Sequence, residues 1–173
     1  MQFSDNKKIT DKGFFTQDAY PLAQRLIGKY ICRKIDGVIS RYRITETECY
    51  IGTGDTACHA HKGKTARTSI MWAGGGVCYV YLCYGIHNML NFVSGEEDNP
   101  QAVLIRGVEG YNGPGKLTKA LDIDRSFNGE SLTTSERIWL EYGERIPYTA
   151  TPRIGINYAE EKDRSALWRF VAE

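Results

Sequence analysis

The sequence lacks any long apolar run. No stretch of its 173 residues approaches the roughly 20 apolar residues that span a bilayer. The first residues, MQFSDNKKITDKGFF, also lack the apolar core of a secretion signal. We therefore expect an intracellular, cytoplasmic protein with no membrane partner.

Cysteine pairs at metal-ligand spacing are absent too. The five cysteines include no CxxC pair, and an odd number argues against a disulfide framework. The run CHAH places Cys58, His59 and His61 together, but no second ligand pair stands at a spacing typical of a zinc finger. We expect reduced cysteines, no bound metal and no cofactor.

The chain also has little net charge. Lysines and arginines number 22 and aspartates and glutamates 21, which gives +1. Composition alone therefore does not point to nucleic acid. Two basic groupings stand out, Lys62, Lys64 and Arg67 in one loop, and Lys116 with Lys119 on a predicted helix. Clusters this small are more often ordinary solvated surface.

Length and composition predict one globular domain. The hydrophobic content of 42% suffices for a core that holds a shaped pocket. We expect the domain to cover residues 1–173, with a polar N-terminal lead at 1–16. The sequence contains neither internal repeats nor low-complexity linkers.

The first half of the chain predicts one helix and one hairpin. Apolar side chains recur at helical spacing within residues 16–30. Residues 30–52 then read as two strands joined at Asp36-Gly37, a dipeptide favoured where both turn residues need positive φ. A long connection over residues 53–76 follows, with a short helix near its start.

The second half predicts more strands. Residues 77–93 read as a second hairpin, with Gly85 set to begin a two-residue Gly-X turn. A strand is predicted over 101–109, Pro114 suits the first turn of a helix, and later segments read as strands or mixed elements. The predicted fold class is therefore a strand-dominated α/β domain of α+β type, in which the hairpins favour antiparallel pairing.

The predicted strand ending in RITETECY carries two acids with the same parity. Strand side chains alternate between faces, so Glu46 and Glu48 share one side with Ile44 and Tyr50. A solvated face would carry its charges opposite its apolar groups. The inversion favours a buried ion pair with a basic partner, and a reactive cleft is the alternative.

An aromatic ring beside a tight turn is hard to bury, and Tyr84 stands beside the predicted second turn. Proteins that enter the minor groove insert such rings between base steps. Packing of Tyr84 against its own sheet is the ordinary alternative. With Tyr50, His59 and Tyr81, the chain has the side chains for a base-sized aromatic slot, because each base–aromatic stack contributes about 1–3 kcal/mol.

Five segments of the sequence resemble those of a known family. The segments RITETECYIGTGDTACHAH, VCYVYLCYGIHNMLNFV, AVLIRGVE, GPGKLTKAL and PRIGINYA occur in the order, and with much of the spacing, of the alkyladenine (3-methyladenine) DNA glycosylases. The resemblance covers almost the whole chain after about residue 20. It implies a single domain with a curved, mostly antiparallel sheet, flanking helices and a protruding β-hairpin.

The resemblance implies a catalytic set of three residues. Glu48 matches the general base that activates a water to attack the anomeric carbon of a flipped nucleotide. Arg106 matches an arginine that holds this water, and the backbone carbonyl of Ile154 matches a further water contact. No lysine stands in the matched catalytic position, so the resemblance implies a monofunctional glycosylase that leaves an abasic site. No catalytic role transfers to Glu46, which we expect to bind a partner such as an arginine.

The resemblance also implies how a damaged base is held. Tyr50 would stack on one face of the base, with His59 and Tyr81 on the other. Asn91 matches the pocket residue that disfavours normal guanine by crowding its amino group.

Two further positions match groups that contact the DNA itself. Tyr84 matches the side chain inserted into the space that the nucleotide vacates, and Lys116 would approach the DNA backbone. The expected partner is double-stranded DNA with damaged purines, among them 3-methyladenine, 7-methylguanine, hypoxanthine and ethenoadenine. We expect a monomer, associated with the nucleoid if the source is bacterial.

Two other functions remain open at this point. A glycosidase would use Glu46 and Glu48 as an acid–nucleophile pair, but same-face strand residues lie roughly 6–7 Å apart, whereas glycosidases set their carboxylates on opposite sides of the scissile bond. A non-catalytic module for damaged or single-stranded DNA would use the tyrosines as stacking platforms.

Overall fold

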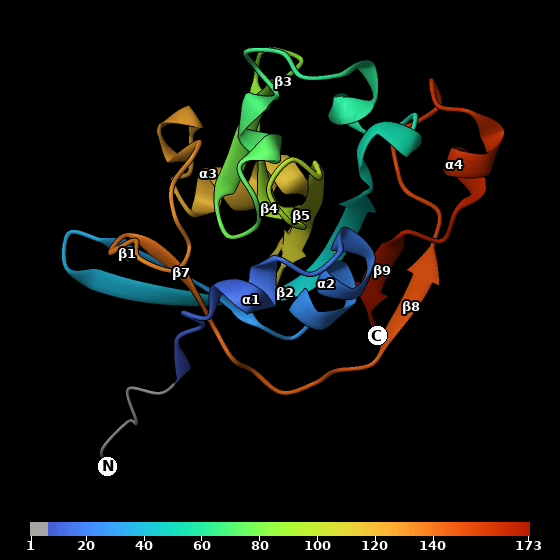
Figure 1. The fold of residues 1–173 in the computed structure, drawn as a ribbon. Helices are drawn as coiled ribbons and strands as arrows, with labels where there is room; N and C mark the ends of the chain where they lie inside the picture. Colours follow the sequence, from blue (N-terminus) through green and yellow to red (C-terminus); the bar gives the residue numbers. More distant parts are fainter. Residues whose placement is uncertain (1–6) are drawn as a thin grey trace.

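A mostly antiparallel sheet dominates the fold, which a computed structural model describes over residues 7–173. Its nine strands are β1 (Tyr30–Ile35), β2 (Val38–Tyr50), β3 (Cys78–Cys83), β4 (His87–Ser94), β5 (Gln101–Val108), β6 (Tyr111–Asn112), β7 (Ile138–Glu141), β8 (Tyr148–Thr151) and β9 (Arg169–Ala172). The main order is β3-β4-β5-β2-β1-β7, with β6 on β5 and with β9 between β2 and β8. The sheet is not closed, and the predicted α+β class is confirmed (Figure 1).

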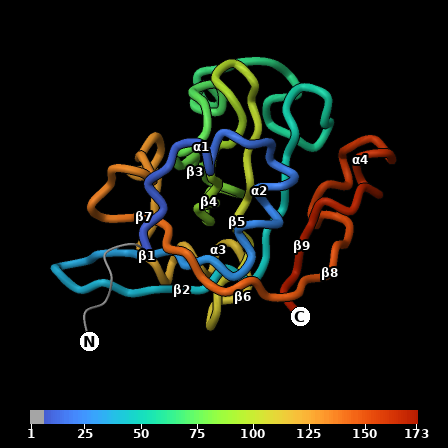
Figure 2. Tube along the Cα trace, turned by 60° about the horizontal axis from the view of Figure 1, so that its bottom comes forward, coloured from blue at the N-terminus to red at the C-terminus, as the bar shows by residue number. Residues whose placement is uncertain are grey.

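Within residues 7–173, four short α-helices flank the sheet: α1 (Lys12–Phe15), α2 (Ala19–Leu26), α3 (Pro114–Ala120) and α4 (Glu161–Ser165). The helix predicted within residues 16–30 is α2, which buries Leu22 and Leu26 and contacts β2 and β5. Figure 2 shows α1 and α2 on one side of the sheet. The helix predicted at Pro114 is α3. None of these helices is long and apolar enough to cross a membrane.

Part of the predicted N-terminal lead is built into the domain. Ile9 and Phe15 are fully buried, and the Ile9 N–H donates to the Leu140 carbonyl at 2.8 Å. The lead therefore adds to the core beside β7. Residues 1–6 lie outside the described part of the chain.

The first hairpin forms as the sequence predicts. Asp36 and Gly37 connect β1 to β2 with φ of 49° and 79°, the positive values that this turn requires. The hairpin extends away from the body of the molecule as a light-blue arm in Figure 1. The rest of β2 turns into the body, where it pairs with β5 and β9.

A β-bulge in β2 separates these two halves. Its pairing with β5 shifts register between Ile44 and Glu46 and again before Thr47. A bulge breaks the strict alternation of side chains. The prediction that Ile44 shares a face with the two acids is therefore wrong, because Ile44 packs into the same core as Cys49.

The second hairpin turns differently from the prediction. Its tip consists of Tyr84, Gly85 and Ile86, and the Ile86 N–H donates to the Cys83 carbonyl at 3.1 Å. Tyr84, with φ of 52°, takes the first turn position, and Gly85, with φ of 70°, takes the second. The predicted Gly-X turn beginning at Gly85 is wrong by one residue. The left-handed conformation costs a non-glycine residue about 1–2 kcal/mol.

The connection predicted over residues 53–76 contains no strand. Three short 3-10 helices interrupt it, Gly52–Gly54, His59–Lys62 and Ser69–Trp72. The first agrees with the short helix predicted near its start. The later segments are mixed, since β7 and β9 are strands while most of residues 152–160 is irregular.

Candidate active site

Glu48 lies fully buried near the end of β2. Its Oε2 accepts the backbone N–H of Ile154 at 2.6 Å, and its Oε1 accepts the Tyr50 hydroxyl at 3.0 Å. Arg106 Nη1 lies 3.5 Å from the same Oε1. Several donors therefore fix the orientation of one carboxylate. The structure brings together the three residues predicted as a catalytic set. The contact of Ile154 with Glu48 is made by its N–H, and the predicted contact of its carbonyl with a water stays a prediction.

Glu46 explains why one strand presents two acids to the same side. Its Oε1 accepts Arg106 Nε at 3.2 Å and Arg169 Nε at 2.6 Å. The interpretation of a buried ion pair is confirmed for this residue. Arg106 thus bridges the two acids, and Arg169 on β9 holds the outer one.

The environment of Glu48 favours the protonated carboxyl more than water does. Burial raises the pKa of Glu48, while Arg106, the Ile154 N–H and the Tyr50 hydroxyl act in the opposite direction. A carboxylate with a raised pKa is a better proton acceptor than an ordinary one. Glu48 is therefore suited to take a proton from water.

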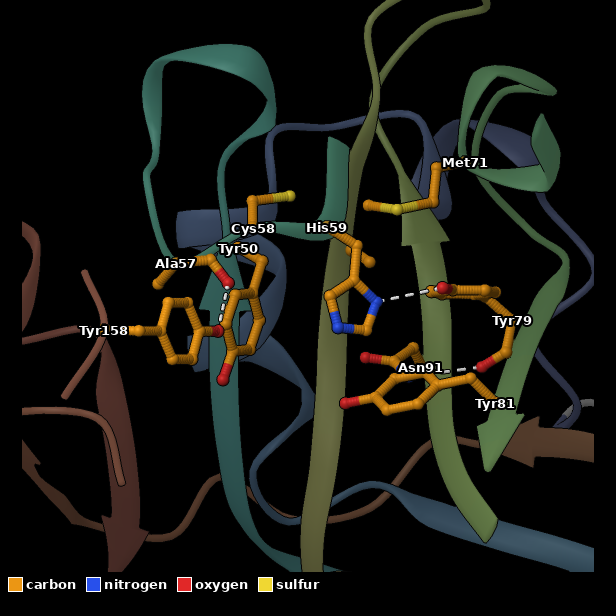
Figure 3. A pocket seen from close by; sticks show the side chains of 10 residues that line it. Tyr50, Ala57, Cys58, His59, Met71, Tyr79, Tyr81, Asn91 and Tyr158 are labelled. Carbon is orange, nitrogen blue, oxygen red and sulfur yellow. Dashed lines mark hydrogen bonds between the residues drawn. The ribbon is translucent and has the colours of Figure 1, made fainter. Parts of the chain in front are cut away.

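Beside Glu48 lies an aromatic slot, defined here by Tyr50, His59, Tyr81 and Asn91. Figure 3 shows the Tyr50 ring on one side of the slot and the His59 and Tyr81 rings on the other. The His59 and Tyr81 centroids are 4.5 Å apart, and His59 Nδ1 lies 3.0 Å from the Tyr79 hydroxyl. The predicted opposition of one tyrosine to a histidine–tyrosine pair is the arrangement found.

Two features fix the chemistry of the slot. Burial, with a smaller effect from Arg67, lowers the pKa of His59 to about 4, so this ring is neutral at neutral pH. Asn91 donates its amide to the backbone carbonyls of Tyr79 and Met89, at 3.2 and 3.4 Å. Its side-chain oxygen then faces the slot (Figure 3). The walls are uncharged aromatic faces, with one polar group between them.

The slot continues into a groove of about 670 Å³. Tyr84 lines the groove from the hairpin tip and is 92% exposed, so the alternative that it packs against its own sheet is wrong. Each predicted basic grouping contributes one side chain here, Arg67 and Lys116. Arg67 also lies over the Tyr81 ring, 5.3 Å from its centroid.

Several contributors to the site were missing from the sequence prediction. Tyr79 and Tyr158 line the slot, and the Tyr158 hydroxyl donates to the Ala57 carbonyl at 2.9 Å. Arg153 lies behind Tyr50 and is paired with Asp55. The tyrosines belong to segments already recognised as motifs. Asp55 and Arg153 do too, but nothing in the sequence marks their pairing across 98 positions.

The cysteine and the two histidines of the CHAH run have three different environments. His59 lies in the slot, His61 Nδ1 lies 2.9 Å from the Thr53 carbonyl, and Cys58 is buried. In residues 7–173, no group of three or more histidine, cysteine or acidic side chains is arranged to hold a metal ion.

The site combines an aromatic slot, a buried carboxylate beside it and a groove with basic side chains. Such sites hold a planar ring next to a proton acceptor. Comparison with known proteins identifies the class more closely. The family model of methylpurine-DNA glycosylase matches residues 13–111 and 109–173.

Individual relatives agree with the family match, and each of the three described next carries the name "Putative 3-methyladenine DNA glycosylase". A protein of Borreliella afzelii (strain PKo) is 45% identical over 94% of this chain and 95% of its own length. One of Psychrobacter cryohalolentis is 44% identical over 94% and 91%. One of Desulfitobacterium hafniense is 39% identical over 96% of both. The chain belongs to the methylpurine-DNA glycosylase family, which consists of DNA-repair hydrolases that act on N-glycosyl bonds.

Proposed function

We propose that the protein removes alkylated purines, foremost 3-methyladenine and 7-methylguanine, from double-stranded DNA and leaves an abasic site. Hypoxanthine and ethenoadenine are further candidate substrates. The observation that carries the proposal is the placement of Glu48 beside the aromatic slot. This fully buried carboxylate accepts the Ile154 N–H at 2.6 Å and the Tyr50 hydroxyl at 3.0 Å. Family membership supports DNA as the substrate.

The proposed reaction needs one carboxylate. Hydrolysis at an anomeric carbon passes through an oxocarbenium-like state, which a nearby anion stabilises. Glu48 accepts a proton from water, and Arg106 with the Ile154 carbonyl holds that water. A base alkylated at N3 or N7 already carries positive charge in the nucleotide, so it departs with little acid assistance. No lysine is among the residues that line the slot in the described part of the chain, which supports a glycosylase without strand cleavage.

Recognition follows from the slot and the groove. The flipped base stacks between Tyr50 on one face and His59 with Tyr81 on the other, and Asn91 crowds the amino group of normal guanine. Flipping costs a few kcal/mol, less for a damaged base, and the stacks repay about 1–3 kcal/mol each.

Outside the slot, Tyr84 fills the space left in the duplex and Lys116 contacts the DNA backbone. We propose that the whole chain forms a single domain and acts as a monomer, because one footprint on the minor groove needs no symmetry partner. A dimer mass in solution would count against this part of the proposal.

The test is release of free base from methylated duplex DNA by the purified protein, at stated salt and with an unmethylated duplex beside it. Release of 3-methyladenine with an intact sugar–phosphate strand is the expected result. Tight binding to single-stranded and damaged duplex DNA alike, with no base released, would instead support a non-catalytic recognition module.

Glu46→Gln is expected to slow base release roughly tenfold, comparable to the ~1.5 kcal/mol of a hydrogen bond to a charged group. The amide still fills the site but holds Arg106 and Arg169 less tightly. Single-turnover rates measure the effect. Glu141→Gln, which weakens the pair of Arg41 on β2 with Glu141 on β7, is the matched control. A loss as deep as that of Glu48→Gln would indicate a two-carboxylate mechanism.

A further inference from the structure

Behind the Tyr50 ring lies a buried ion pair that the proposed reaction does not use. Arg153 donates from Nη1 to Asp55 Oδ2 at 2.6 Å and from Nη2 to Oδ1 at 2.9 Å. The side chains of Arg153 and Asp55 are 0% and 1% exposed. Two parallel hydrogen bonds in a site closed to solvent hold both side chains in one orientation, whereas an ion pair on the surface is free to rearrange.

The Asp55–Arg153 pair joins segments that are distant in sequence. Asp55 accepts two backbone N–H groups of its own turn at 3.0 Å each, those of Ile51 and Ala57. Arg153 donates to the backbone carbonyls of Cys49 and Asp163, at 3.0 and 3.2 Å. The end of β2, the turn that follows it and the C-terminal segment therefore meet at one guanidinium.

Two contacts connect this guanidinium to the proposed reaction. It lies 4.8 Å from the ring centroid of Tyr50 and 4.8 Å from that of Trp168. Arg153 also directly precedes Ile154, whose N–H is 2.6 Å from Glu48 Oε2. A displacement of Arg153 would move both the base-stacking ring and a donor to the carboxylate.

Stability alone does not explain the pair. Desolvation of two charges offsets much of their attraction, so a buried ion pair is weak evidence for stability. Among the described residues, Arg153 Nε is also buried without a hydrogen-bond partner, which is a further cost. Because these costs leave the pair with little net stabilisation, its effect on the geometry of the site is the role to consider.

We propose that Asp55 and Arg153 are positioning residues for base excision: their ion pair sets the plane of Tyr50 and holds the Ile154 N–H on Glu48. The inference rests on the proposed function, which it extends from the reacting groups to their support. It assigns the pair no contact with the base, the sugar or the attacking water.

The pair also influences the charge state of Glu48. Burial raises the pKa of Glu48, and the Ile154 N–H and Arg153 are among the groups that oppose the rise. The other titratable groups around this carboxyl are Glu46, Cys49 and Tyr50 on β2, Tyr81 on β3, Arg106 on β5, Arg169 on β9 and Tyr158 in the C-terminal segment. Displacement of Arg153 and of the Ile154 N–H leaves these groups in place, so the pKa of Glu48 rises further and the acid limb of the rate profile moves to higher pH.

The experiment compares single-turnover base release by the full chain across acid and neutral pH for wild type, Arg153→Lys and Asp55→Asn. Arg137→Lys, which alters an arginine–glutamate pair outside the slot and groove, is the control for a general loss of stability. We expect a loss of roughly 100-fold for both pair variants, the effect of about 1 Å of misplacement at a reacting centre. The acid limb should shift upward in Arg153→Lys, in which the Ile154 N–H is displaced from Glu48. Affinity for damaged duplex should fall as well, but by less than the rate, because the Tyr50 ring shifts while the contacts in the groove remain.

A third variant keeps the inference falsifiable if the ion-pair variants do not fold. Trp168→Leu leaves both charges but removes the second ring that packs against the guanidinium, and a smaller loss with the same direction of pH shift as in Arg153→Lys is expected. Folded variants that release base at the wild-type rate with an unshifted acid limb would overturn the inference alone. A wild type that releases no base would overturn the proposed function and this inference together.

Discussion

Glu48→Gln is expected to lower base release from methylated duplex DNA by about 10³-fold, within the range of a lost general base. The glutamine oxygen can still accept the Ile154 N–H, so the shape of the site is kept. The amide cannot take a proton from water, and it removes the negative charge that faces the oxocarbenium-like state. Single-turnover assays with protein in excess measure the rate without interference from product release.

Binding separates this prediction from a loss of folding. The variant should retain its affinity for damaged duplex, because stacking in the slot and contacts in the groove are untouched. Glu97→Gln, an exposed carboxylate in the loop after β4, controls for the change of charge. Release by Glu48→Gln at the wild-type rate would contradict the assignment of Glu48 as the base.

The same residue sets a pH dependence with a definite sign. Burial, the largest cause, raises the pKa of Glu48 in the folded protein. Base release needs the ionised form, so the rate should fall as pH drops through a value above that of an ordinary glutamate. Stability runs the other way, because the folded state binds this proton more tightly than the unfolded state and loses that contribution as pH rises. Glu48→Gln should therefore have a Tm at neutral pH equal to or above that of wild type.

Local signals predicted much of the fold. The Asp36-Gly37 turn and helix α2 depend on a few adjacent residues, and both form as expected. The bulge at Glu46 escaped prediction because it depends on the register between β2 and β5, two strands that are distant in sequence. The error at Tyr84-Gly85 has a different cause, since local preference disfavours a tyrosine at positive φ and the structure places one there.

The site was predictable to the extent that it lies within short motifs. Glu48, Tyr50 and His59 fall in one such segment, and the structure places Glu48 beside the slot that Tyr50 and His59 line. The ion pair of Asp55 with Arg153 joins residues 98 positions apart, and Glu46 meets Arg169 across 123. Pairings at such separations arise only when the sheet assembles, so neither partner's sequence neighbourhood indicates them.

Tyr84→Ala is expected to reduce base release from duplex DNA roughly tenfold to a hundredfold, in line with the ~1–3 kcal/mol of one base–aromatic stack. Tyr84 is 92% exposed at the hairpin tip and has no packing role to lose. In the proposed reaction its ring occupies the gap left by the flipped nucleotide. Without the ring, the nucleotide returns to the duplex more readily, and the fraction in the slot falls.

The choice of substrate distinguishes a wedge from a simple contact. A damaged base in single-stranded DNA needs no unstacking from a partner strand, so the variant should act on it at nearly the wild-type rate. Tyr142→Ala, which removes another partly exposed tyrosine from outside the groove, should affect neither substrate. An equal loss on duplex and single strand would show that Tyr84 contacts DNA without acting as a wedge.

The backbone conformation of Tyr84 predicts that replacing this residue by glycine stabilises the fold, although the same change impairs base release. Its φ of 52° lies in the region that glycine adopts without strain. Tyr84→Gly should therefore raise the free energy of unfolding, by at most the ~1–2 kcal/mol of the left-handed conformation and less for the added freedom of the unfolded chain. Denaturant titration measures this gain, and the same variant should be as poor on duplex DNA as Tyr84→Ala. A strained residue whose removal stabilises the fold but impairs duplex excision would be held in place for function; a loss of stability in Tyr84→Gly would instead mean that the ring supports the hairpin.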